Sequence, residues 1–156
     1  MVDWRRLPVP QFCERLIGFS VPENGEILVV SYEGVHLLRL GPQITVETDN
    51  EYAEHDIYDP VTGVASYRGK EYRIIGLHGG SPLVEGPDGE RLVLDTDSET
   101  LSVVRGGKMV YSTAYENFSG DWAAATFSQD GRYIVLGAPY DFDFIVLERP
   151  SGGCAG

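Results

Sequence analysis

The chain has 156 residues, of which 24 are acidic and 12 basic, so its formal net charge is −12. This length predicts one domain over residues 1–156, large enough for a hydrophobic core without disulfides or a structural metal. An acidic surface repels phosphate backbones and anionic lipids, which argues against nucleic-acid and membrane binding.

Residues 1–15 are expected to form an N-terminal extension with a short helical turn, interrupted by Pro8 and Pro10. No apolar run follows Arg5 and Arg6, as a targeting signal would require. No segment approaches the roughly 20 apolar residues of a membrane span. A cytoplasmic location is therefore expected.

Short apolar and β-branched segments follow, separated by Gly, Pro, Asn and Asp. They predict strands at 27–32, 35–40, 44–48, 64–67, 71–77, 91–95, 100–104, 108–112, 123–127, 132–137 and 144–148. Residues 150–156 are predicted to be a flexible tail. The pattern indicates an all-β protein with antiparallel sheets, arranged either as a small propeller-like structure or as a curled sandwich or barrel.

The two cysteines, Cys13 and Cys154, lie near opposite ends of the chain. Free thiols are the favoured interpretation because a cytoplasmic compartment is reducing. A disulfide is the alternative, since chain ends often lie close together in a closed domain.

Three segments repeat the order of tight turn, apolar strand, turn and apolar strand: 23–40, 87–104 and 129–147. In the last, Phe127-Ser128 is followed by a turn at Asp130-Gly131 and a second apolar strand. Residues 123–148 thereby resemble a blade of WD40-like β-propellers, although the chain lacks Gly-His and Trp-Asp at the blade ends. The resemblance implies at most four blades, or a fragment that closes by forming a homo-oligomer; a curled antiparallel sheet fits equally well.

Motifs for nucleotide binding, for a dedicated zinc site and for an EF-hand are absent from the sequence. The tripeptide His78-Gly79-Gly80 is similar to the oxyanion loop of esterase-like hydrolases, but no Gly-x-Ser-x-Gly elbow accompanies it. A glycine turn is the favoured interpretation of this tripeptide. No catalytic residue is predicted, and a non-enzymatic protein is favoured.

An acidic cluster occupies residues 47–59, with one histidine among six carboxylates. A solvated loop explains such a run, and the functional alternatives are a docking surface for a basic protein or a divalent-cation loop. The candidate binding residues in this cluster are Asp49, Glu51, Glu54, His55 and Asp56.

A second group of oxygen-bearing side chains lies between two predicted strands and includes Asp95, Asp97 and Glu99. A plain hairpin loop is the favoured interpretation, because Asp, Thr and Ser are common turn residues. These three residues are also the candidate metal ligands, for calcium. No other cofactor is predicted.

Two further sets are candidates for ligand binding. Asp141 and Asp143 alternate with phenylalanines, so in a strand both carboxylates share one face, either as a solvated outer face or as an acid–base pair. Tyr115 and Trp122 flank a polar loop; they could bind a sugar or peptide, or fix that loop to the core.

Two functions therefore remain. The first is a non-enzymatic protein-interaction module that presents an acidic β surface to a basic partner. The alternative is a carbohydrate- or divalent-cation-binding protein, with a hydrolase as one form of it. A β scaffold alone does not choose between them, because such scaffolds support unrelated functions.

Overall fold

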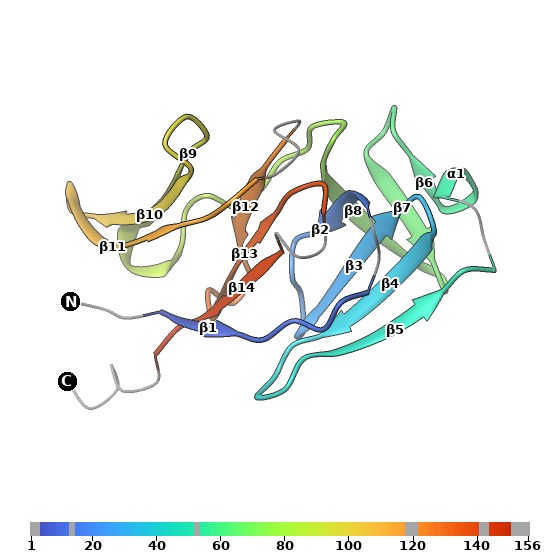
Figure 1. The fold of residues 1–156 in the computed structure, drawn as a ribbon, viewed down its shortest axis with the longest axis horizontal. Coiled ribbons are helices and arrows are strands. Elements are labelled where there is room, and N and C mark those ends of the chain that lie inside the picture. Colours follow the sequence, from blue (N-terminus) through green and yellow to red (C-terminus); the bar gives the residue numbers. More distant parts are fainter. Residues whose placement is uncertain (1–3, 13–14, 52–53, 118–121, 141–143, 151–156) are drawn as a thin grey trace.

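The computed structural model describes residues 4–12, 15–51, 54–117, 122–140 and 144–150. Strands dominate these residues, and the prediction of an all-β fold with antiparallel sheets is confirmed (Figure 1). The strands are β1 (Arg5–Leu7), β2 (Leu16–Ser20), β3 (Glu26–Ser31), β4 (Gly34–Arg39), β5 (Thr45–Asp49), β6 (Tyr58–Asp59), β7 (Val64–Tyr67), β8 (Lys70–Gly76), β9 (Glu90–Asp95), β10 (Thr100–Arg105), β11 (Lys108–Ala114), β12 (Ala124–Phe127), β13 (Tyr133–Gly137) and β14 (Ile145–Glu148). A one-turn helix, α1 (Glu54–Ile57), and a short 3-10 turn (Pro87–Gly89) lie between strands.

The described strands form three antiparallel sheets. A seven-stranded sheet has the order β5-β4-β3-β2-β8-β7-β6, a four-stranded sheet the order β1-β14-β13-β12, and a three-stranded sheet the order β11-β10-β9. An extended segment joins the two smaller sheets: the Phe127 N–H donates to the Leu83 carbonyl at 2.8 Å, and the Leu92 N–H donates to the Val84 carbonyl at 2.7 Å.

Alternation along β13 explains how the sheets are layered. Tyr133 and Val135 pack into a core shared with the seven-stranded sheet, whereas Ile134 and Leu136 pack into a core shared with the three-stranded sheet. Successive strand residues point to opposite faces, so the four-stranded sheet is buried on both sides. It forms the middle layer of the molecule.

The seven-stranded sheet curls into a half-barrel around a third core. Strands from both halves of the sheet build this core. Leu28 on β3 and Leu37 on β4 come from one half, and Ala65 and Tyr67 on β7 come from the other. All four side chains are buried. The curl therefore brings the β7–β8 hairpin over β4 and β5 (Figure 1).

Tight glycine-containing turns connect two of the strand pairs. Arg68 and Gly69 have φ of 52° and 77° and connect β7 to β8, while Gly106 and Gly107 have φ of 61° and 77° and connect β10 to β11. Two consecutive positive φ values give the hairpin turn whose twist matches that of the strands. β7 with β8 and β10 with β11 are therefore antiparallel hairpins.

The predicted helical turn within residues 1–15 is wrong. Arg5–Leu7 is strand β1, which pairs with β14, and Trp4 and Leu7 are buried. The structure also contains a strand that the sequence did not predict, β2. This strand is buried on both faces and so shows no alternation, and Gly18 in its middle has no room for a side chain, because a Cβ would lie 2.6 Å from Ile74 Cγ2.

The three repeated segments each contain an antiparallel hairpin, formed by β3–β4, β9–β10 and β13–β14 in three different sheets. Residues 123–148 contain β12, β13 and β14, the last strand that the structure describes. The N-terminal strand β1 completes this sheet to four strands. The resemblance to a propeller blade stays a prediction.

Candidate functional site

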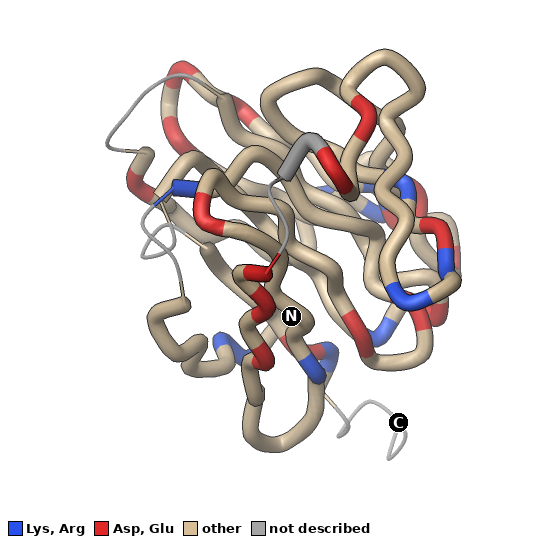
Figure 2. The backbone as a smooth tube through the Cα atoms, turned by 90° about the vertical axis from the view of Figure 1, so that its right-hand side faces the viewer, with Lys and Arg blue, Asp and Glu red and all other residues tan. Residues whose placement is uncertain are grey.

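The acidic cluster lies at one rim of the curled sheet, on β5 and the connection through α1 to β6. Six acidic residues and no Lys or Arg occur between Arg39 and Arg68. Figure 2 looks onto this side of the molecule, where acidic positions outnumber basic ones. We call the described acidic residues of this stretch the acidic rim: Glu47, Asp49, Glu51, Asp56 and Asp59.

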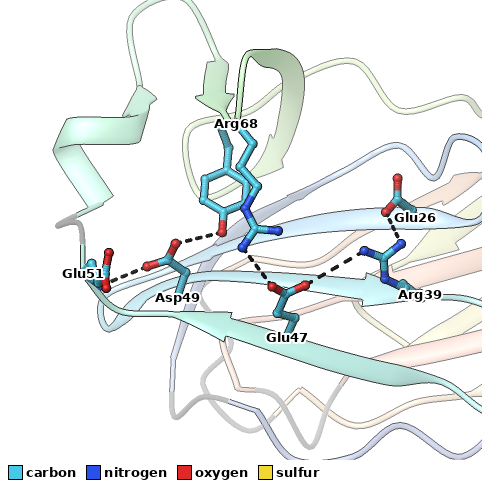
Figure 3. A network of polar contacts seen from close by, with 7 residues as sticks. Glu26, Arg39, Glu47, Asp49, Glu51 and Arg68 are labelled. Carbon is cyan, nitrogen blue, oxygen red and sulfur yellow. Dashed lines mark hydrogen bonds and ion pairs between the residues drawn. The ribbon is translucent and has the colours of Figure 1, made fainter.

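Glu47 is the centre of an ion-pair network (Figure 3). One carboxylate oxygen accepts a hydrogen bond from Arg68 Nη2 at 2.8 Å, and the other lies 4.0 Å from Arg39 Nη2. Arg39 in turn donates to Glu26 at 2.9 Å. The hydrogen bond and the charge of Arg68 lower the pKa of Glu47. This carboxylate therefore stays ionised, and two arginines of the fold balance its negative charge.

Asp49 also connects β5 to β7 across the opening of the curled sheet. Its Oδ1 accepts the Glu51 backbone N–H at 3.0 Å, and its Oδ2 accepts the Tyr67 hydroxyl at 2.9 Å (Figure 3). The pKa of Asp49 is lowered, first by the hydrogen bond from the Glu51 backbone and then by the hydrogen bond from the Tyr67 hydroxyl. The pKa of Tyr67 is raised, mainly because the hydroxyl is buried. Glu47 and Asp49 thus clamp the β7–β8 hairpin onto β5.

The remaining described carboxylates of the rim face water. Glu51, Asp56 and Asp59 are exposed. Asp59 also accepts the Val61 N–H at 2.9 Å, which stabilises the turn before β7. The backbone of residues 54 and 55 forms α1, but the side chains of the candidates Glu54 and His55 lie outside the described residues.

The candidate metal ligands stabilise a hairpin loop between β9 and β10. Asp95 Oδ1 accepts the N–H groups of Asp97 and Ser98 at 3.0 and 3.1 Å, with the Ser98 contact the largest cause of a lowered pKa of Asp95. Glu99 accepts the Asn117 N–H at 2.8 Å. In the part of the chain that the structure describes, no three His, Cys, Asp or Glu side chains are grouped as a metal ion would need. Calcium binding stays a prediction.

The aromatic candidates are not brought together. Tyr115 is buried in the core between the four- and three-stranded sheets, whereas the half-buried Trp122 packs against the core between the four- and seven-stranded sheets. The Trp122 carbonyl accepts a hydrogen bond from the Asn117 side-chain amide at 3.0 Å. These contacts fit the interpretation that both rings fix the loop to the core. Asp141 and Asp143 lie outside the described residues.

A pocket of about 410 Å³, which the sequence did not predict, opens where β2 and β8 meet the segment around residue 82 and the turn before β13. Its polar lining includes Glu23, Glu71, Arg73 and Gln129. The lining comes from four distant segments, so no local motif marks it. Its mixed charges and hydroxyl groups could hold a small polar molecule.

Comparison with protein-family models, with curated proteins and with solved structures gave no match. Among the described residues, no helix has both the length and the apolar character needed to cross a bilayer.

Proposed function

We propose that this protein is a non-enzymatic interaction module that binds a basic protein through its acidic rim. The observation that carries the proposal is the segregation of charge: six acidic residues and no Lys or Arg between Arg39 and Arg68. Arg68 is committed to Glu47 at the base of the rim. The outer carboxylates therefore create a negative field that steers a basic surface towards this end of the molecule.

The clamp beneath the rim supports this function. Asp49 and Tyr67 hold the curl closed, and the Glu51 backbone is fixed by the Asp49 carboxylate. The exposed Glu51 side chain therefore projects from an ordered backbone. A surface that is ordered before binding loses less conformational entropy on association.

The experiment compares two charge-reversed variants as bait in a lysate of the source organism. E51K/D56K reverses two exposed rim carboxylates, and E85K/D88K reverses two exposed carboxylates outside the rim. Both variants change the net charge by the same amount. A basic protein retained by the wild type and by E85K/D88K, but lost by E51K/D56K, is the expected result.

Salt separates a specific rim complex from general attraction. Retention should fall between 50 and 300 mM salt, because exposed charge pairs are screened over about 10 Å at 0.1 M. Equal loss of the captured protein by both variants would show that only net charge matters. Full retention by E51K/D56K would overturn the rim as the binding surface.

A cytoplasmic location stays a prediction.

The pocket supports a second candidate function, the binding of a small polar ligand such as a carbohydrate. Glu71 and Arg73 lie two residues apart on β8, so their side chains share one face of the strand, and both line the pocket. Charged groups of both signs can hydrogen-bond the hydroxyl groups of a sugar. Titration with a panel of sugars should give heat that R73A abolishes and R105A preserves; no heat with the wild type would refute sugar binding.

A further inference from the structure

Strand β11 is the longest edge strand in the described sheets. Six of its seven residues pair with β10, with Val110 left at a bulge, and no other described strand pairs with it. The opposite edge of this sheet, β9, is partly covered by the extended segment at Val84. An uncovered edge presents a row of backbone N–H and C=O groups to any strand of suitable orientation. Figure 1 shows this sheet at the far end of the molecule from β5 and α1.

Charge is divided along the strand direction of this sheet. Three exposed basic residues mark the end at the β10–β11 turn: Arg91, Arg105 and Lys108. Within the described part of the chain these three form no ion pair. Three exposed acidic residues mark the opposite end, at the β9–β10 loop and just after β11: Asp95, Asp97 and Glu116.

A two-fold axis reverses strand direction, so it would place the basic end of one such sheet against the acidic end of another. The edge is therefore complementary to itself in the antiparallel orientation. Ser112 lies midway between Lys108 and Glu116 along the chain. Its exposed, small side chain leaves room for a close strand crossing.

We propose that β11 is a self-association surface, on which a second copy of the chain pairs antiparallel across a two-fold axis near Ser112. The two three-stranded sheets then continue into one sheet, and Lys108 of each copy faces Glu116 of the other. Pairing also covers apolar surface, because the Met109 side chain on this edge is 62% exposed.

The overall charge of −12 opposes association of two copies. At 0.15 M ionic strength the screening length is about 8 Å, so repulsion between distant charges is reduced more than attraction between contacting ones. The strand edge also contributes backbone hydrogen bonds, which do not depend on net charge. The dimer is therefore measured at 0.15 M salt.

The first experiment is a charge exchange followed by sedimentation equilibrium. K108E should weaken the dimer by roughly tenfold, because each of two symmetric pairs changes from attractive to repulsive. The exchanged variant K108E/E116K should restore wild-type affinity. A wild type that stays monomeric up to 200 µM, or an exchanged variant that is no tighter than K108E, would overturn the proposal.

The second experiment tests the strand register. In a background with C13S and C154S, S112C should form an intermolecular disulfide under mild oxidation, because cysteines opposite one another on paired strands meet the geometry of that bond. S66C, an exposed serine on β7, is the matched control and should stay monomeric. Equal cross-linking of both variants would refute this register. Neither experiment alters the acidic rim, so the two proposals fail independently.

Discussion

The ion pair between Arg149 and Glu90 connects the end of β14 to the start of β9. The Glu90 side chain is 3% exposed, and Arg149 Nη1 donates to it at 2.9 Å while Nη2 binds its other oxygen. Arg149 Nε also donates to the Gly131 carbonyl at 3.0 Å, and the guanidinium lies 4.6 Å from the Trp4 ring centroid. One side chain thus holds three segments together.

Replacing Arg149 by methionine should strongly destabilise the fold. Removal of one partner of a buried pair costs about 3–5 kcal/mol, because the other charge is left without compensation. Arg149 is 27% exposed, so water can reach part of the site and we expect the lower end of that range. For a domain of this size about 3 kcal/mol corresponds to a fall in Tm of roughly 6–12 °C.

The assay is urea unfolding of four proteins: wild type, R149M, E90Q and the double variant E90Q/R149M. If the pair acts as a unit, the double variant should be more stable than the sum of the single effects predicts, by about 1.5 kcal/mol or more. Loss of the buried carboxylate removes the penalty that R149M alone creates. Single effects that add within about 0.5 kcal/mol would refute a coupled pair.

Two further predictions concern single residues. Burial raises the pKa of Asp130, but hydrogen bonds from the Ser128 hydroxyl and the Arg132 N–H hold it below its ordinary value of 3.8. The stability that the ionised Asp130 contributes is complete above pH 3.8 and is lost as the pH falls through the lower pKa of the folded state. In urea titrations, D130N should therefore lose less free energy of unfolding than the wild type between pH 6 and pH 2.5. An equal loss in both proteins would contradict this prediction. Gly34 has φ of 142°, and a Cβ there would lie 2.4 Å from a β5 carbonyl oxygen, so thermal unfolding should show G34A destabilised by about 2 kcal/mol or more. G63A, at φ 73° with open space, should cost only about 1 kcal/mol, and equal effects would show that the contact is unimportant.

Local patterns were sufficient to predict most hairpins. The sequence predicts strands at 27–32 and 35–40, and the structure has β3 and β4 shifted by one residue, at Glu26–Ser31 and Gly34–Arg39. Turn residues fix such pairs, because the backbone angles of a two-residue loop determine which residues face each other. The residues that determine this pairing all lie between Glu26 and Arg39.

Pairing between distant segments could not be predicted in the same way. β1 is three residues long and gains its structure from β14, with Arg5 opposite Glu148. β2 lies between β3 and β8 and is buried throughout, so alternation gives no signal. In both strands tertiary contacts determine the conformation, and composition near the N-terminus is a weak guide.

The acidic cluster shows the same limit at the candidate site. The sequence treats its carboxylates as equivalent, but the structure divides them into a clamp (Glu47 and Asp49) and exposed groups such as Glu51. The division depends on Tyr67 and Arg68, which approach β5 only because the sheet curls. The number of acidic residues marks the region in the sequence, and the three-dimensional pairing shows which carboxylates are held in the fold and which are exposed.

The layering of the sheets limits where any partner can bind. The faces of the four-stranded sheet are buried on both sides, as Val135 in one core and Ile134 in the other demonstrate. The faces of this sheet are therefore closed to a partner, which leaves the loops, the strand edges and the two outer sheets. The seven-stranded sheet offers a rim with excess negative charge, while the three-stranded sheet offers an edge on which both signs of charge occur. We propose the first surface for a partner of opposite charge and the second for a copy of the chain. The two surfaces lie at opposite ends of the molecule, so the two proposals do not exclude each other (Figure 1).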